Sequence, residues 1–377
     1  MKKYILSLLA VVTISTAVHS QGCVAIRTVG GLNTMEHAGM MHEGMNAVKD
    51  SSKWDLNLSY RYFSSYKHYN GTDEQTQRVK DGTEVRNYNR TIDVSLLRKI
   101  NNDWSIGFSM PLIYNERTSK YEHISNAATS PRFATAASGI GDIRITAYKW
   151  LIAPKAGNKG NLLAGVGVKL PTGNYKATDK FHYSLTATRE GAVDQSIQPG
   201  DGGLGLTLEL NGFRQLSSQW SLYGNAYYLI NPRDNNGVST LRGVAIATPP
   251  TASQATAIKY ASNIMSVPDQ YLLRGGANWT KEALTLSLGG RYECIPTFDL
   301  IGGNTGFRRP GTVITAEPGA NYMFKKFNVY AYLPVALFRE RNQSYPDILK
   351  TLDTKTFSRG DAAFADYSIT IGVGYKF

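Results

Sequence analysis

The chain ends on DYSITIGVGYKF, a stretch in which two kinds of side chain alternate strictly up to the last residue. One series is aromatic or branched at every position: Tyr367, Ile369, Ile371, Val373, Tyr375 and Phe377. The other is small or polar: Ser368, Thr370, Gly372, Gly374 and Lys376. A period of two is typical of a strand whose faces meet different environments. Because the large apolar side chains continue to the end, the pattern favours a strand that closes a barrel in lipid.

The same alternation recurs along the chain in segments of about 10–14 residues, while helix signals are almost absent. We expect twelve strands, at 54–67, 86–100, 104–116, 139–152, 161–172, 203–216, 220–230, 269–280, 284–296, 311–325, 327–341 and 365–377. Short and long connections alternate between them, as an up-and-down barrel requires. The sequence therefore predicts an all-β, up-and-down antiparallel transmembrane β-barrel over residues 51–377, with both termini on the periplasmic, short-turn side.

The two faces of the expected strands differ in polarity. In 203–216, leucines occupy one face, whereas Thr207, Glu209 and Asn211 share the other. A charge at the bilayer midplane costs about 2–4 kcal/mol, so the charged faces must point inward. Cys294 falls on the outward face of its strand. Four tryptophans fall at the short-turn ends, where an interfacial aromatic girdle is expected: Trp54, Trp104, Trp220 and Trp279.

The first residues predict export. Lys2 and Lys3 precede an apolar stretch, and a cut after Ser20 makes residues 1–20 a signal peptide. A lipoprotein signal is the alternative, because Cys23 follows closely, although the usual leucine-like residue three positions earlier is missing. No run of about 18 apolar residues follows. An exported membrane protein without apolar helices must close a barrel, which predicts the outer membrane of a Gram-negative bacterium.

The net charge of the chain limits the classes of binding partner that we expect. The whole chain carries +12, and removal of Lys2 and Lys3 leaves +10. Export argues against nucleic acid, so this charge favours anionic solutes or anionic lipid headgroups. We expect outer-membrane lipid, a small-molecule solute and the barrel assembly machinery, which reads C-terminal aromatic residues, as partners. The sequence leaves the oligomeric state open.

Charged residues on the inward faces are the candidate site. We expect them to line the lumen: Asp93, Asp142, Arg144, Lys169, Glu209, Arg274, Arg291, Glu293 and Glu317. They form either a constriction that selects solutes by charge and width or a paired network that fills a narrow interior. For the constriction itself the strongest candidates are Asp142, Arg144, Glu209, Arg291 and Glu293.

Residues 21–50 form an N-terminal periplasmic segment that contains TMEHAGMMHEGM. Thioether and imidazole ligands suit Cu(I), so His37, His42, Met41 and Met45 are candidate metal ligands. The alternative is a short amphipathic or disordered segment at the barrel mouth. Histidines elsewhere fall in expected loops without a serine partner. The sequence therefore predicts no enzyme, no catalytic residues and no cofactor.

Three stretches resemble a known family: GIGDIRITAYKWL, LLAGVGVKLPTGNY and QPGDGGLGLTLELNGFRQLSS. They are similar to the meta-pathway phenol degradation (MetA-like) family of outer-membrane transporters, over residues 139–230. A weaker similarity continues in RRPGTVITAEPGANYMF. The resemblance implies a β-barrel that passes small compounds, aromatic ones among them. It implies no catalytic residues, and the Met/His segment lies outside it.

We therefore expect an outer-membrane channel for passive passage of small molecules, hydrophobic or aromatic compounds among them. Passage is expected to be passive because no plug domain or nucleotide-binding motif is recognisable in the sequence. Two alternatives stay open. One is a non-transporting structural or surface-interaction barrel with a filled lumen. The other is copper handling by the Met/His segment.

Overall fold

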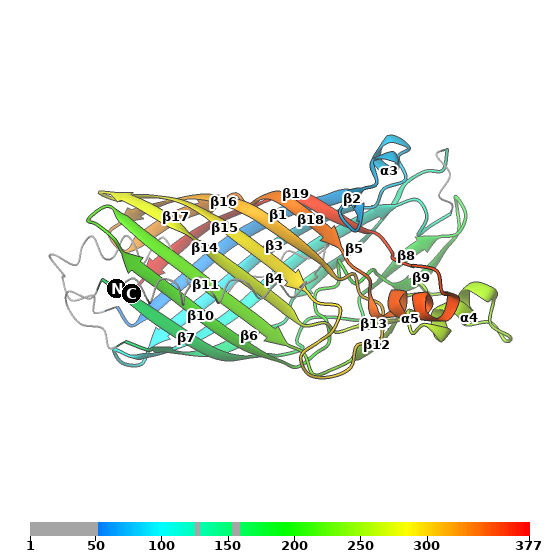
Figure 1. Cartoon of the computed structure of the whole chain (residues 1–377), viewed down its shortest axis with the longest axis horizontal. Coiled ribbons are helices and arrows are strands. Elements are labelled where there is room, and N and C mark those ends of the chain that lie inside the picture. The colour runs from blue at the N-terminus through cyan, green and yellow to red at the C-terminus, as the bar shows by residue number, and fades with distance from the viewer. Residues whose placement is uncertain (1–51, 125–128, 153–158) are drawn as a thin grey trace.

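The computed structural model describes residues 52–124, 129–152 and 159–377, which form a closed antiparallel β-barrel (Figure 1). The expected signal peptide (1–20) lies outside the described residues. So do His37, His42, Met41 and Met45 of the expected metal site, within residues 21–50. Among the described residues, no helix has the length and apolar character needed to cross a membrane.

The barrel wall is built from strands that follow one another around the ring. They are β1 (Trp54–Asn70), β3 (Arg86–Lys99), β4 (Trp104–Ser119), β5 (Phe133–Ile140), β6 (Arg144–Trp150), β7 (Gly160–Lys169), β10 (Gly205–Gln215), β11 (Trp220–Ile230), β14 (Gln270–Lys281), β15 (Leu284–Ile295), β16 (Gly311–Phe324), β17 (Phe327–Tyr332), β18 (Val335–Arg341) and β19 (Ala362–Lys376). Pairing of β19 with β1 closes the ring. Since β5 continues into β6 and β17 into β18, the wall has twelve strands, and the expected fold class is confirmed.

Two of the expected strands are interrupted in the structure, and several others begin or end a few residues away from the expected bounds. The expected strand 139–152 begins earlier, as β5, and breaks after Ile140 before resuming as β6. Residues 133–138 were therefore wrongly predicted to lie in a loop. The expected strand 327–341 breaks between Tyr332 and Val335. Pro334 lies in this break, and proline has no N–H to donate to a ladder.

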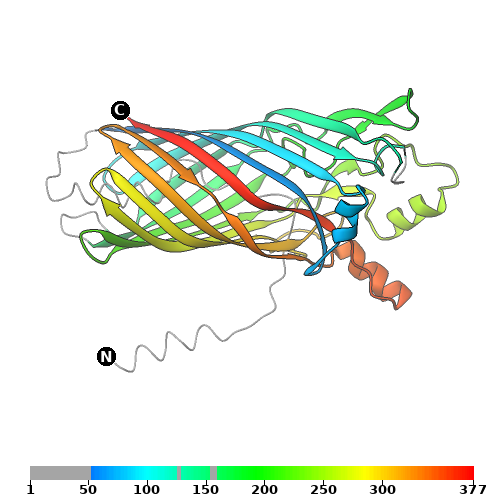
Figure 2. The same ribbon diagram turned by 90° about the horizontal axis from the view of Figure 1, so that it is seen from above.

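The two ends of the barrel differ in their connections, as Figure 2 shows. The turn end holds the short connections, the start of β1 and the end of β19. The loop end holds the long connections, which carry small elements of their own. These are β2 (Asp73–Glu74), α3 (Thr76–Lys80), β8 (Thr178–His182), β9 (Thr188–Ala192), β12 (Asn235–Ser239), α4 (Ala252–Lys259), β13 (Ile264–Ser266) and α5 (Tyr345–Thr354).

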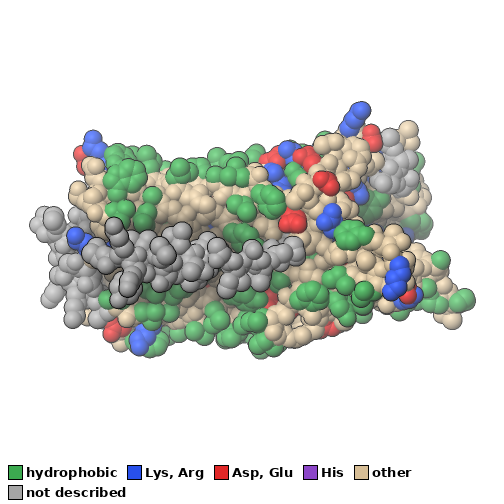
Figure 3. Space-filling view, viewed as in Figure 1, with side chains coloured by type: hydrophobic (Ala, Val, Ile, Leu, Met, Phe, Trp, Pro, Cys, Tyr) green, Lys and Arg blue, Asp and Glu red, His purple; other side chains and the backbone are tan. Residues whose placement is uncertain are grey.

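The outer wall is apolar, as expected. Hydrophobic side chains are spread over the visible face of the wall, and many of the charged ones lie toward its ends (Figure 3). Leu206 and Leu208 are exposed, whereas the intervening Thr207 is fully buried. At the turn end, Trp220 begins β11 and pairs with Trp279 of β14, in agreement with the expected girdle.

Cys294 pairs with Tyr271 of β14 and so keeps the outward parity expected for it, but its side chain is only 1% exposed. It lines a pocket of about 50 Å³ together with Ala336 and Phe364. This pocket lies where β18 separates from β19, since the two strands pair only at Val335 and Tyr367. Strand periodicity therefore predicts the face of Cys294 but not its burial.

Candidate functional site

A loop segment folds into the barrel from the loop end and narrows the lumen. This inward segment, residues 193–203, connects β9 to β10. Val193 and Ile197 are fully buried against Ala137 and Ala177. The side-chain amide of Gln198 donates to the carbonyl oxygens of Ala177 (3.2 Å) and Val193 (3.0 Å). These contacts fix the segment against the wall formed by β5.

Glycines allow the inward segment to approach the wall closely. A Cβ at position 200 would lie 2.6 Å from the carbonyl oxygen of Gly173 and 2.7 Å from a carboxylate oxygen of Asp142. Any side chain at position 200 would therefore displace the segment, because these distances are well inside van der Waals contact.

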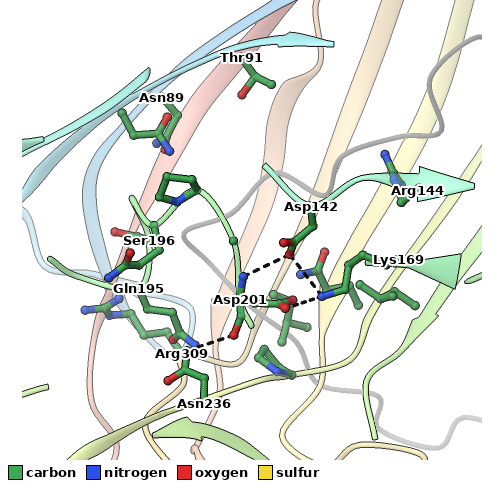
Figure 4. Close-up of a pocket in the computed structure, with 18 of the residues that line it drawn as sticks. Asn89, Thr91, Asp142, Arg144, Lys169, Gln195, Ser196, Asp201, Asn236 and Arg309 are labelled. Atoms are coloured by element: carbon green, nitrogen blue, oxygen red, sulfur yellow. Dashed lines mark hydrogen bonds and ion pairs between the residues drawn. The ribbon is translucent and has the colours of Figure 1, made fainter. Parts of the chain in front are cut away.

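The inward segment brings Asp201 into a charged cluster with two of the predicted residues, Asp142 and Lys169 (Figure 4). The ammonium of Lys169 donates to Asp201 and lies 3.5 Å from Asp142. Asp142 also accepts from the backbone N–H groups of Gly173 (3.0 Å) and Asp201 (3.2 Å). We call Asp142, Lys169 and Asp201 the lysine cluster. It ties the inward segment to the break between β5 and β6.

Arg144 lies beside this cluster on β6. Its guanidinium donates to the hydroxyl of Tyr227 (3.3 Å) and lies over that ring, 5.7 Å from the centroid. Two more of the predicted residues, Glu209 and Asp93, are the carboxylates that act on Arg144 electrostatically. Glu209 also accepts a hydrogen bond from the hydroxyl of Tyr148 (2.9 Å).

The remaining predicted residues form a second group, the arginine–glutamate cluster, on β14, β15 and β16. Arg274 pairs with Glu317, to which its Nε donates at 2.8 Å. Arg291 pairs with Glu293 (2.6 Å) and lies 3.5 Å from Glu317. This cluster contains two cations and two carboxylates, so it carries no net charge.

A cavity of about 130 Å³, the lumen cavity, is lined by the lysine cluster and by residues of β1 and β3. Its charged lining is mainly cationic: Arg61, Arg144, Lys169 and Arg309 against Asp142 and Asp201. The structure thus brings together Asp142, Arg144 and Lys169 around one cavity. The arginine–glutamate cluster does not line it.

Sequence reasoning missed three contributors to the site: Asp201, Arg309 and the inward segment itself. All belong to long loops, whose path periodicity does not predict. The stretch QPGDGG was the one available signal, since glycines on both sides of a carboxylate permit close packing. Within the described ranges, no group of three or more His, Cys, Asp or Glu side chains could hold a metal ion.

Comparison with known proteins supports the fold. An outer membrane channel from Pseudomonas putida F1 superposes with a TM-score of 0.55 at 13% identity, covering 86% of this chain and 96% of that one. Two further structures are similar at TM-scores below 0.5. The translocator domain of the autotransporter NalP from Neisseria meningitidis scores 0.45 at 14% identity, covering 91% and 97% of the two chains. The toluene transporter TodX of P. putida scores 0.39 at 11% identity, covering 89% and 91%.

No family model matches the chain, and no curated protein does. Membership of the meta-pathway phenol degradation family therefore stays a prediction. The similarity to the P. putida F1 channel establishes a barrel of the outer-membrane type, and at 13% identity it establishes the fold alone.

Proposed function

We propose that this chain is a channel of the Gram-negative outer membrane through which small molecules pass passively. In this proposal the loop end faces the outside of the cell and the turn end faces the periplasm. Outer-membrane lipid surrounds the wall, and the barrel assembly machinery inserts it. The observation that carries the proposal is a pair of adjacent cavities, one among the loops and one inside the barrel.

The second cavity, the loop cavity, lies among the loops and has a volume of about 550 Å³. Gln195 and Arg309 line both the loop cavity and the lumen cavity. These two side chains lie between the loop cavity and the cavity that contains Arg144 and Lys169, so the two cavities follow one another from the loops into the barrel. A barrel that served only as a scaffold would gain stability by filling such space, because protein interiors are normally packed without large voids.

Hydrophobic or aromatic compounds are among the proposed solutes. Tyr121, Tyr260 and Phe307 line the loop cavity, and Phe63 and Tyr227 line the lumen cavity. Flat rings next to cations can accommodate aromatic solutes by stacking. The family resemblance of residues 139–230 points to the same solutes.

The lumen cavity is the proposed constriction. At about 130 Å³ it is too small for most organic solutes, so passage requires movement of the inward segment or a very small solute. The ion pairs of Lys169 with Asp201 and Asp142 hold this segment in place. The arginine–glutamate cluster is proposed to stabilise the wall, because its charges neutralise one another.

Single-channel conductance of the refolded mature protein in a planar bilayer tests the proposal. Arg144→Ala removes a cation that lines the lumen cavity, and we expect it to change the ion selectivity of discrete openings. Glu293→Ala, in the arginine–glutamate cluster, is expected to have a smaller effect on selectivity. Arg98→Ala is the matched control, since Arg98 is exposed over Trp54 at the turn end.

Two outcomes would contradict the proposal. A folded, heat-stable protein that neither conducts nor admits small solutes into liposomes would favour the non-transporting barrel with a filled lumen. Openings whose selectivity is the same in Arg144→Ala and the parent would show that the pore does not pass through the lumen cavity.

A further inference from the structure

The loop cavity has the size and position of a ligand site. Its volume of about 550 Å³ falls within the range of roughly 300–1,000 Å³ typical of small-molecule pockets. It is lined by loop residues from several connections, including Tyr121, Gln195, Arg242, Phe307 and Arg359. A solute that enters from the loop end reaches this cavity before the lumen cavity.

Cations outnumber carboxylates in its lining by three. The cations are Arg117, Arg242, Arg309, Arg341, Lys350 and Arg359, and the carboxylates are Asp194, Asp347 and Asp361. Two charged neighbours, Glu122 and Arg78, add one charge of each sign. A concave surface with one sign of excess charge attracts ions of the opposite sign and raises their local concentration.

An ion-pair chain forms part of the cavity wall. Arg242 pairs with Glu122 (3.1 Å), and Glu122 pairs with Arg117 (2.8 Å). Asp194 then joins Arg117 (3.6 Å) to Arg309 (2.6 Å). Burial by itself raises the pKa of both carboxyls. The positive charge of Arg117 lowers both pKa values, and Arg309 adds to this effect at Asp194 as Arg242 does at Glu122. These charges outweigh the effect of burial, so the pKa of each carboxyl lies below its ordinary value. Both acids therefore remain ionised, and the chain of three arginines retains one positive charge.

Arg359 is a cation of the cavity lining that is held against the wall, with its guanidinium next to Gly71. Its Nε donates to the side-chain oxygen of Asn70 (2.7 Å), and the Asn70 amide donates back to the Arg359 carbonyl oxygen (3.0 Å). The guanidinium also lies over the ring of Phe357, 5.3 Å from its centroid. Within the described ranges, no carboxylate lies at ion-pair distance from Arg359 or from Lys350.

The same cavity supplies flat apolar surface. Arg242 lies over Tyr121, 5.5 Å from the ring centroid, and Arg309 lies over Phe307 at 4.7 Å. Tyr260 adds a third ring. Aromatic faces beside guanidinium groups suit a ligand that combines a planar body with an anionic group.

We infer that the loop cavity binds small organic anions with a planar body and a carboxylate, and that Arg359 anchors the carboxylate. This inference rests on the proposed channel function, for which it names the solute class. The anion would be held next to the cationic lining of the lumen cavity, which it enters past Arg309.

Calorimetric titration of the mature protein in detergent with sodium benzoate tests the inference. Benzamide is the uncharged probe of the same shape. We expect benzoate to bind about tenfold more tightly than benzamide, because a charge-assisted bond to a fixed guanidinium is stronger than a neutral one. Arg359→Gln should abolish this difference. Lys355→Gln, which removes an exposed cation of the same loop outside the cavity, should preserve it.

Equal affinities of the parent for the two probes would overturn the inference, as would an unchanged preference in Arg359→Gln. Unfolding temperatures of both variants show whether either is merely misfolded. If Arg359→Gln misfolds, Arg359→Lys, which keeps the charge, must retain a preference for benzoate or the inference fails.

Liposome uptake separates the inference from the proposed function. Equal uptake of both probes with equal binding leaves the channel standing without the anion site, whereas selective binding without uptake supports the site and contradicts the channel.

Discussion

Inward-facing tyrosines lie over glycines on neighbouring strands throughout the barrel. Tyr330 lies over Gly372 and Tyr332 over Gly319, and a Cβ at either glycine would come within 2.7 Å of the ring. The same arrangement recurs for Tyr148 over Gly165 and for Tyr223 over Gly276. A tyrosine ring fits into the narrow lumen only where the residue paired with it on the neighbouring strand has no side chain. This explains why glycine is frequent on inward faces.

Gly372→Ala should therefore destabilise the barrel. The added methyl group would lie 2.3 Å from Tyr330, so the ring or the strand must shift, which costs about 1–3 kcal/mol. Urea unfolding of the protein in phospholipid vesicles, followed by tryptophan fluorescence, measures the change. Gly290→Ala is the matched control, because its nearest contact would be 4.0 Å away. Equal stability of the two variants would refute the steric account.

His123 makes the packing of the loop end sensitive to acid. Its ring stacks on Phe181 (5.5 Å between centroids), and its Nδ1 accepts from the N–H of His182 (3.1 Å). Burial lowers the pKa of His123 from 6.5 to about 4, with Glu122, His182, Arg242 and Asp179 as charged or titratable neighbours. In an opened loop the imidazole would regain its ordinary pKa of about 6.5 and bind a proton more readily.

Acidification should therefore open this loop. The packing has its full stability above pH 6.5, and its stability falls as the pH drops toward 4, because only the opened form takes up the proton. At pH 5 the opening equilibrium should be about 20-fold higher than at neutral pH. Hydrogen exchange of β8 and β9, corrected for intrinsic rates, measures it. In His123→Phe, which keeps a ring but cannot titrate, this increase should disappear, and a persisting increase would contradict the assignment.

At the scale of elements, the wall has little backbone pairing next to the break between β17 and β18, because β18 pairs with β19 at a single position. Beyond the pairing of Val335 with Tyr367, side-chain hydrogen bonds rather than backbone pairs connect β18 to β19. Arg339 donates through Nε to the carbonyl oxygen of Ala365 (3.0 Å) and through a terminal nitrogen to Asp366 (2.6 Å). Cys294 lies behind this seam.

Arg339→Met should loosen the seam, because methionine retains much of the aliphatic stem but makes none of these hydrogen bonds. We expect the thiol of Cys294 to react several-fold faster with a small lipid-soluble maleimide, in a background that carries Cys23→Ser. Arg214→Met, which alters an exposed arginine at the turn end, is the control. If Arg339→Met and the parent are labelled at the same rate, Arg339 does not hold the seam closed.

Strand periodicity predicted the wall well because one chemical rule acts at every position. Thr207 faces the lumen and its neighbouring leucines face lipid in only one register, because a slip of one residue would exchange the two faces. The positions and the number of the strands therefore follow from the alternation. The prediction was wrong where a local effect interrupts the pattern. Pro334 breaks a ladder from within, and β5 begins in ATAAS, where small side chains on both faces hide the alternation.

The candidate site was predictable only in part for the same reason. Asp142, Arg144 and Lys169 belong to strands or lie next to them, so parity placed them inward, and the structure brings them together. Asp201 and Arg309 come from loops whose paths depend on contacts distant in sequence, such as the pair of Arg309 with Asp194 (2.6 Å).

At the scale of the whole molecule, the barrel closes where its first and last strands meet. The carbonyl oxygen of Phe377 accepts from the N–H groups of Lys53 (3.1 Å) and Trp54 (3.0 Å), and its own N–H donates to Trp54 (3.0 Å). The Phe377 ring stacks on Trp54 (6.5 Å) and on Tyr375 (5.5 Å). The terminal residue thus contributes backbone closure and a ring at the lipid interface.

Phe377→Ala separates these two contributions, because it keeps the backbone bonds and removes only the ring. Loss of the stacking should cost about 0.5–1.5 kcal/mol, so unassisted folding into lipid vesicles should change little. Assembly in vesicles that contain the barrel assembly machinery should slow several-fold if the machinery reads the terminal aromatic residue. Tyr375→Ala is the matched control, since Tyr375 stacks on Phe327 (4.4 Å) and Phe377 but is not terminal. If both variants fold equally slowly with and without the machinery, the terminal ring acts through packing alone, and the expected partnership with the machinery through Phe377 is wrong.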